Sequence, residues 1–125
     1  MELKRCIVLE ALNSMGGSLS LDKLAALLFM AERISGVSIF NWTIEEGLLF
    51  SNDLLDELES MGREGLVNIS GNLVALVKEI NVGCFGWAYD RIRGALRDVA
   101  ARIRGYGDSE AINAALSYAY DHENV

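Results

Sequence analysis

Residues 51–77 have the sequence SNDLLDELESMGREGLVNISGNLVALV, which predicts a helix that leads directly into a β-hairpin. Ser51 and Asn52 can cap the helix, because their side-chain oxygens accept hydrogen bonds from the free N–H groups of a first helical turn. The helix is expected over residues 53–61. Its apolar residues recur every three or four positions and therefore share one face; they are Leu54, Leu55, Leu58 and Met61.

The second half of this stretch predicts the hairpin. Two segments rich in apolar residues, 66–70 and 73–77, are joined by Gly71 and Asn72. Both of these residues tolerate the positive φ angles that a tight turn needs. This is the clearest hairpin signal in the chain, and it follows the predicted helix within a few residues.

Towards the N-terminus, the pattern predicts two further helices with a short extended piece between them. An apolar stripe over residues 2–15 ends at Gly16 and Gly17, and Ser20 can cap a second helix that ends at Gly36. Residues 37–44 then mix β-branched and aromatic side chains, with apolar residues alternating at their end. This mixture predicts a strand or one arm of a hairpin.

Towards the C-terminus, a long helix is expected over residues 88–104, and Asp108 can cap a last helix. A row of apolar residues on the long helix alternates steps of three and four, a heptad-like spacing; it consists of Tyr89, Ile92, Leu96, Val99 and Ile103. Such a row either covers the core of its own subunit, which is the commoner arrangement, or forms a seam in a dimer. The sequence leaves both alternatives open.

Together these elements predict a mainly α protein with a small β-hairpin, in the α+β class. No proline and no Ser/Gly-rich linker interrupts the 125 residues, so one domain is expected over residues 1–125. The order of helix, short strand, two helices and hairpin is that of a winged helix-turn-helix domain. We therefore expect a winged-helix core over residues 1–80 and a C-terminal helical extension over residues 84–122.

Part of the chain resembles a known family. The resemblance covers residues 21–67, where Lys23-Leu24 opens a buried helix and an aromatic extended arm precedes Leu54-Leu55-Asp56-Glu57-Leu58 and Gly65-Leu66-Val67. This arrangement is similar to the YwgA-like and Panacea (SocA-like) prokaryotic proteins, which are winged-helix variants with an insertion between the second and third helices. The resemblance implies regulation by protein contact, such as toxin neutralisation.

The charge distribution argues against the usual docking of a winged helix on DNA. The chain has 11 basic and 18 acidic residues, a net charge of −7, and residues 41–80 carry two basic residues against eight acidic ones. Lys and Arg contacts to phosphate supply most non-specific affinity for DNA, so this region would be repelled by a major groove. The third helix contributes four acidic candidates for binding a protein partner, namely Asp53, Asp56, Glu57 and Glu59. The alternative is an ordinary solvated face whose first acidic residues interact with the helix dipole.

Basic residues gather instead on the long C-terminal helix. Arg93, Arg97 and Arg104 are spaced by four and seven residues and therefore share one face. This stripe could contact the phosphates of DNA, or the acidic surface of a second copy in a homodimer. It could also be an exposed face with intrahelical pairs such as Asp98 with Arg102.

The sequence contains no recognisable catalytic or cofactor motif. The one His, His122, stands in a polar tail, and Cys6 and Cys84 are isolated from any metal-binding cluster, so we expect buried thiols and no catalytic, cofactor or metal site. The longest apolar run, 24–31, is too short to cross a bilayer. We therefore expect a cytoplasmic, non-enzymatic regulatory protein that binds a protein partner or a second copy of itself. The alternative is a transcriptional regulator that contacts DNA through the arginine stripe.

Overall fold

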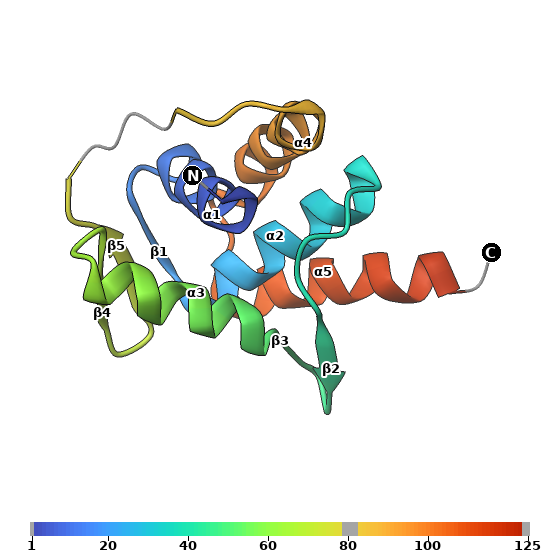
Figure 1. The fold of residues 1–125 in the computed structure, drawn as a ribbon. Helices are drawn as coiled ribbons and strands as arrows, with labels where there is room; N and C mark the ends of the chain where they lie inside the picture. The colour runs from blue at the N-terminus through green and yellow to red at the C-terminus, as the bar shows by residue number, and fades with distance from the viewer. Residues whose placement is uncertain (1, 79–82, 124–125) are drawn as a thin grey trace.

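The computed structural model describes residues 2–78 and 83–123, with side chains up to residue 119, and over these ranges the chain forms five helices and five short strands (Figure 1). It is an α+β protein. Figure 1 shows α2 in the middle of the molecule, between the pair α1 and α4 and the C-terminal helix α5. The helices are α1 (Leu3–Ser14), α2 (Leu21–Ser35), α3 (Asn52–Arg63), α4 (Trp87–Ile103) and α5 (Asp108–Glu123).

The strands form two small antiparallel sheets. The first has the order β1-β5-β4, with Leu19 opposite Val74 and Val74 opposite Ile69. The second is a hairpin of β2 and β3, in which Ile44 lies opposite Leu49. The strands are β1 (Ser18–Ser20), β2 (Thr43–Glu45), β3 (Leu48–Phe50), β4 (Val67–Ser70) and β5 (Leu73–Leu76).

The predicted helix and hairpin in residues 51–77 are confirmed. The Ser51 side chain caps α3 by accepting a hydrogen bond from the Leu54 N–H at 3.3 Å. Gly71 has a φ of 60° in the turn between β4 and β5, as the hairpin requires. The local signals were sufficient here, because a cap and a turn depend on residues that are close in sequence.

The first two helices and the extended piece between them are also confirmed. The Ser20 side chain accepts a hydrogen bond from the Lys23 N–H at 3.2 Å, and Gly36 ends α2 in the left-handed conformation with a φ of 75°. Gly36 suits this position because it has no Cβ. The predicted starts of the last two helices agree with the structure to within one residue, since α4 begins at Trp87 and α5 at Asp108.

The strand or hairpin arm predicted over residues 37–44 is confirmed only at its end, where Thr43 and Ile44 belong to one arm of a hairpin, and is wrong for the rest. Residues 37–42 form an irregular loop, and a strand begins only at Thr43. The reason is that the Glu32 carboxylate accepts hydrogen bonds from the N–H groups of Ile39 and Phe40, at 2.7 and 3.3 Å. These donors are therefore satisfied by a side chain of α2 instead of by a neighbouring strand.

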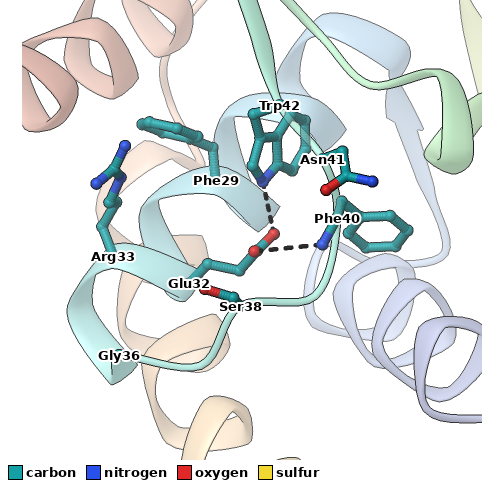
Figure 2. Close-up of a pocket in the computed structure, with 8 residues that line it drawn as sticks. All are labelled: Phe29, Glu32, Arg33, Gly36, Ser38, Phe40, Asn41 and Trp42. Atoms are coloured by element: carbon teal, nitrogen blue, oxygen red, sulfur yellow. Dashed lines mark hydrogen bonds between the residues drawn. The ribbon is translucent and has the colours of Figure 1, made fainter.

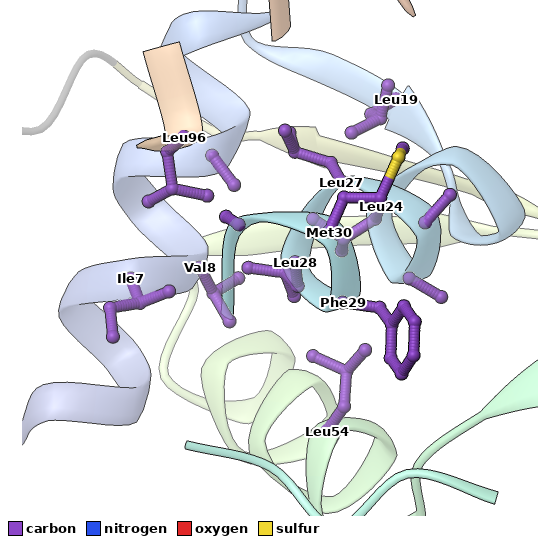
Figure 3. Close-up of a cluster of buried hydrophobic side chains, with 14 of the residues drawn as sticks. Ile7, Val8, Leu19, Leu24, Leu27, Leu28, Phe29, Met30, Leu54 and Leu96 are labelled. Carbon is purple, nitrogen blue, oxygen red and sulfur yellow. The ribbon is translucent and has the colours of Figure 1, made fainter. Parts of the chain in front are cut away.

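The hydrophobic core surrounds α2 (Figure 3). Leu24, Leu28 and Phe29 are almost completely buried, and they contact side chains from the other elements in one continuous cluster. Ile7 and Val8 of α1, Leu54 of α3 and Leu96 of α4 belong to the same cluster. The predicted core and the predicted C-terminal extension therefore share their buried side chains, as Ala111, Ala115 and Ala119 of α5 show.

Candidate interaction surfaces

Asp53, at the start of α3, forms an ion pair and hydrogen bonds with other residues of the same chain. Its carboxylate lies 3.2 Å from the Lys4 ammonium of α1 and accepts the Asn41 N–H at 3.1 and 3.2 Å, and it also accepts the Ser51 hydroxyl. Burial alone would raise the pKa of Asp53, but the hydrogen bonds from Ser51 and Asn41 and the charge of Lys4 lower it below its usual value. This carboxylate helps to hold α3 against α1 and the preceding loop.

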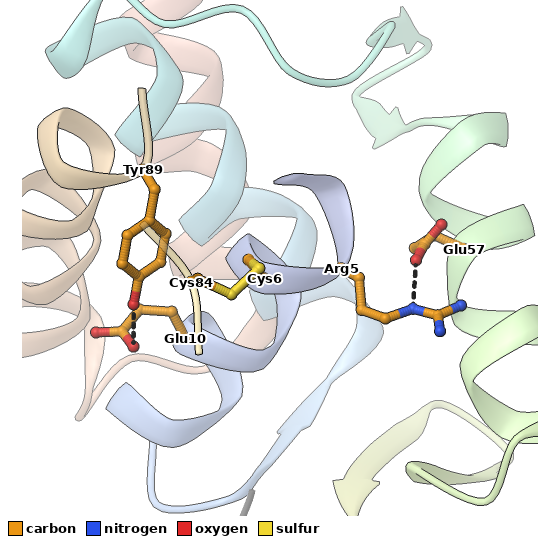
Figure 4. The surroundings of a disulfide bond; sticks show 6 residues. All are labelled: Arg5, Cys6, Glu10, Glu57, Cys84 and Tyr89. Atoms are coloured by element: carbon orange, nitrogen blue, oxygen red, sulfur yellow. Dashed lines mark hydrogen bonds and ion pairs between the residues drawn. A yellow bond between two sulfur atoms is a disulfide. The ribbon is translucent and has the colours of Figure 1, made fainter. Parts of the chain in front are cut away.

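Glu57, one turn further along α3, also forms an ion pair with a residue of α1. The Arg5 guanidinium of α1 donates to Glu57 at 3.0 Å (Figure 4), and it also contacts Glu64 at 2.6 Å and the Ser60 hydroxyl at 3.1 Å. Two of the four acidic residues that we predicted to bind a partner therefore attach α3 to α1. They are not free for that role, because opposite charges from the first helix already neutralise them.

Asp56 and Glu59 are the acidic candidates that lie on the solvent side of α3. Asp56 is exposed, and Glu59 is exposed and pairs with Arg63 at 2.8 Å along the same helix. Leu55 lies beside them and is 40% exposed. The outward surface of α3 is therefore less acidic and more apolar than the sequence indicated.

We expect Asp53→Asn to lower the free energy of unfolding by about 1–2 kcal/mol at pH 7, because hydrogen bonds to a charged group are lost. Since folding lowers the pKa of Asp53, its contribution is present above the unfolded pKa of about 3.9 and is lost as the pH falls through the folded pKa. The difference between wild type and variant should therefore shrink in acid. Urea unfolding between pH 7 and pH 2 measures it.

Asp56→Asn is the matched control for this prediction, because Asp56 is an exposed aspartate on the same helix. It should change the unfolding free energy by no more than about 0.5 kcal/mol. If Asp53→Asn costs no more than Asp56→Asn at pH 7, the contacts of Asp53 do not stabilise the fold.

The predicted arginine stripe lies on the side of α4 that faces α1. Arg93 and Arg97 both contact one oxygen of Glu10, at 3.3 and 3.4 Å, and Arg104 donates to the backbone oxygen of Ser14 at 3.0 Å. The three arginines do share one face, but part of their charge is neutralised by α1. The suggested pair of Asp98 with Arg102 is not formed, since Arg102 donates instead to the Tyr118 hydroxyl at 2.9 Å.

The heptad-like row of α4 lies in the core of its own subunit. Its five residues are at most 5% exposed and belong to the side of α4 that packs against α1 and α2; they are Tyr89, Ile92, Leu96, Val99 and Ile103. The structure therefore leaves them no place in a seam between two copies.

Tyr89 also has a polar contact. Its hydroxyl donates to Glu10 at 3.2 Å (Figure 4), and burial together with the charge of Glu10 raises the pKa of Tyr89. Glu10 thus accepts a hydrogen bond from the Tyr89 hydroxyl and forms ion pairs with Arg93 and Arg97, all from α4. This network connects α1 to α4 on the polar edge of the core.

A cavity of about 640 Å³ opens where the loop 37–42 crosses the end of α2 (Figure 2). Glu32 lies in the wall of this cavity and also accepts the Trp42 indole N–H at 2.6 Å. Burial raises the pKa of this carboxyl, although the hydrogen bonds from Ile39, Phe40 and Trp42 act to lower it. The Arg33 guanidinium lies 5.0 Å from the centre of the Phe29 ring. Since the carboxylate is already bonded by the loop, we assign it the role of anchoring that loop to α2.

Cys6 and Cys84 form a disulfide bond (Figure 4), which corrects our prediction of two buried thiols. Their Cα atoms lie 6.1 Å apart although the two residues are 78 positions apart in the sequence. No spacing motif indicates such a pairing, because it depends on where the chain places α1 and the start of α4. Disulfides persist in oxidising compartments and in intracellular proteins of hyperthermophiles, so the cytoplasmic location stays a prediction.

A groove follows β3, between the start of α2, α3 and the start of α5. It consists of two open cavities of about 300 and 80 Å³ that share Leu49 and Asp22 in their walls. Leu48 lines the first and Leu55 the second, and these two leucines are 63% and 40% exposed. The sequence did not indicate this groove, because β3 was not predicted, although the Glu46-Gly47 pair between two short apolar segments was a usable turn signal.

No three His, Cys, Asp or Glu side chains come together as a metal site in the part of the chain that the structure describes. Within those same ranges, no helix has both the length and the apolar character needed to span a bilayer. The side chain of His122 lies outside the described residues. Comparisons with protein-family models, with curated proteins and with solved structures found no match for this chain.

Proposed function

We propose that this chain is a non-enzymatic regulatory protein on a winged-helix scaffold, and that it binds a protein partner through the outward side of α3 and the adjoining hairpins. The observation that carries the proposal is the kind of side chain that this surface exposes. It combines exposed apolar side chains, Leu48 and Leu55, with the exposed carboxylate of Asp56. Apolar side chains left exposed beside surface cavities are typical of protein interaction sites.

The order of the elements supports the winged-helix part of the proposal. A short strand between the first two helices pairs with the second strand of the hairpin that follows α3, giving the strand order β1-β5-β4. In a winged helix, α3 would be the recognition helix and β4 with β5 the wing. The resemblance to the Panacea-like proteins supports regulation by protein contact in the same way.

The charges favour a protein over DNA as the partner. The outward side of α3 presents Asp56 and a neutralised pair, Glu59 with Arg63, and the sequence has no basic residue between Arg63 and Lys78. The wing instead exposes Ile69 and Leu73. Without cations to contact phosphates, polar side chains on this surface could not be positioned on a duplex.

Affinity capture with three baits tests the proposal. We expect one or more proteins from the source cells to be retained by the wild type and lost with Asp56→Lys/Glu59→Lys, because the double change reverses the charge of the α3 surface. The matched control is Asp90→Lys/Asp98→Lys, which makes the same change on the exposed side of α4. If all three baits retain the same proteins, the α3 surface is not the binding site.

The second candidate function is DNA binding through the arginine stripe. It is favoured by the net charge of +3 over residues 81–105 and by the half-exposed guanidinium groups of Arg93 and Arg97. A salt series with a random-sequence duplex tests it. We expect no binding even at low salt, whereas binding that falls steeply with salt and is abolished by Arg93→Glu/Arg97→Glu would establish the DNA regulator instead.

A further inference from the structure

We infer that the groove along β3 accepts a cationic amphipathic helix of the partner protein, with apolar side chains in the two cavities and Lys or Arg side chains on the carboxylates around them. This inference rests on the proposed function and names the chemistry of the partner. It is carried by the shape of the groove, its exposed leucines and the sign of the charges along it.

The groove offers two places for apolar side chains. The cavity of about 300 Å³ lies between Leu48 of β3 and Ile112 of α5, and the cavity of about 80 Å³ is lined by Ala25, Leu54 and Leu55. Leu49 lines both cavities and is itself only 5% exposed. Side chains on one face of a helix recur every three or four residues, and this is the usual way in which a helix fills an apolar groove.

Covering this groove would be favourable. Leu48 and Leu55 are 63% and 40% exposed, although each lies beside buried apolar residues. Removal of their apolar surface from water would stabilise a complex. Both leucines belong to regular elements, β3 and α3, so they are held in place before a partner arrives.

The charges along the groove are negative. Asp22 lines both cavities and Asp108 lines the larger one, and they are the charged residues among the described residues in these walls. One oxygen of Asp108 accepts the Ser20 hydroxyl at 2.6 Å, and a carboxylate can accept further hydrogen bonds. Lys and Arg on the polar edges of a helix would complement this surface.

A second copy of this chain fits the groove less well than a separate partner. Its arginine stripe would be the source of positive charge, but Arg93 and Arg97 already contact Glu10, and Arg104 is bonded to the backbone of α1. The apolar row of the same helix is buried in its own core. The stripe therefore offers charge without the apolar side chains that the groove requires.

The test uses a fluorescent 18-residue helical peptide with leucines at helical spacing on one face and lysines on the other positions. We expect the wild type to bind it and to bind a version with glutamate in place of lysine at least tenfold more weakly. Leu48→Ser and Leu55→Ser should each weaken binding of the lysine peptide about tenfold. Fluorescence anisotropy measures the affinities, and circular dichroism checks that the variants are folded.

Ile34→Ser is the matched control, because Ile34 is 46% exposed on α2 and lines neither cavity. It should leave the affinity within twofold of the wild type. The inference is overturned if Ile34→Ser weakens binding as much as Leu55→Ser, or if the lysine and glutamate peptides bind equally. It is also overturned if the wild type dimerises in solution and Leu48→Ser makes it monomeric, since a second copy would then cover the groove.

Capture experiments separate this inference from the proposed function. A partner that is lost with Asp56→Lys/Glu59→Lys but retained by Leu48→Ser overturns the groove and leaves the proposed function intact. If the lysine peptide needs Leu48 and Leu55 while no captured protein depends on the charge of α3, the groove is supported and the proposed use of the α3 surface is wrong.

Discussion

Replacing Cys6 and Cys84 together by alanine will lower the free energy of unfolding by about 2–4 kcal/mol. The disulfide closes a loop that contains α2, α3 and both hairpins, since the two cysteines are 78 positions apart in the sequence. Without it, the unfolded chain regains the freedom that the cross-link removes, and the cost grows with the length of the loop. Urea unfolding of the oxidised wild type and of the variant measures the difference.

Reduction of the wild type is the control for this prediction. The reduced wild type should unfold at nearly the same urea concentration as the alanine variant, and the variant should be insensitive to the reductant. If oxidised and reduced wild type unfold together, the disulfide contributes nothing to stability.

Leu96→Ala will lower the free energy of unfolding by about 2–5 kcal/mol, whatever the protein concentration. Leu96 is fully buried in the core cluster that α4 shares with α1 and α2. Its truncation removes apolar contacts and leaves a cavity that the neighbouring helices can fill only in part. Chemical denaturation over a hundredfold range of protein concentration tests both the size of the loss and its independence of concentration.

Leu73→Ala is the matched control, because Leu73 is 48% exposed on β5. It should cost less than about 1 kcal/mol. A loss for Leu96→Ala that grows on dilution would contradict the burial of this row in its own subunit, since the stability of an interface depends on protein concentration and that of a core does not.

The sequence did not indicate that the two leucines of the groove, Leu48 and Leu55, are exposed. Leu55 was predicted to lie on the inner face of α3, but it is half-exposed beside the cavity next to Leu49. The sequence pattern predicts no element at Leu48, although Glu46 and Gly47 have positive φ angles of 50° and 77° in a hairpin turn. The alternation of side chains in a strand of three residues is too short to distinguish a buried leucine from an exposed one.

Tertiary contacts also divide the four acidic candidates of α3 into an exposed pair and a pair bound to α1. Asp56 and Glu59 face solvent, as helical spacing predicted for the outer side of α3. Asp53 and Glu57 face Lys4 and Arg5, which lie about 50 residues earlier in the chain. A count of charges along the sequence could not reveal this neutralisation, because it depends on how α1 and α3 pack.

Local sequence patterns were enough to predict the elements whose stability depends on neighbouring residues. The caps at Ser20 and Ser51, the helix end at Gly36 and the turn at Gly71 involve hydrogen bonds or φ angles within a few residues, so the local pattern was sufficient. Contacts between residues that are far apart in the sequence become apparent only in the folded protein. The disulfide and the attachment of α3 to α1 have no local signal, because they depend on the packing of the helices. The apolar row of α4 is visible in the local spacing, but only the packing around α2 shows that it lies in the core of its own subunit.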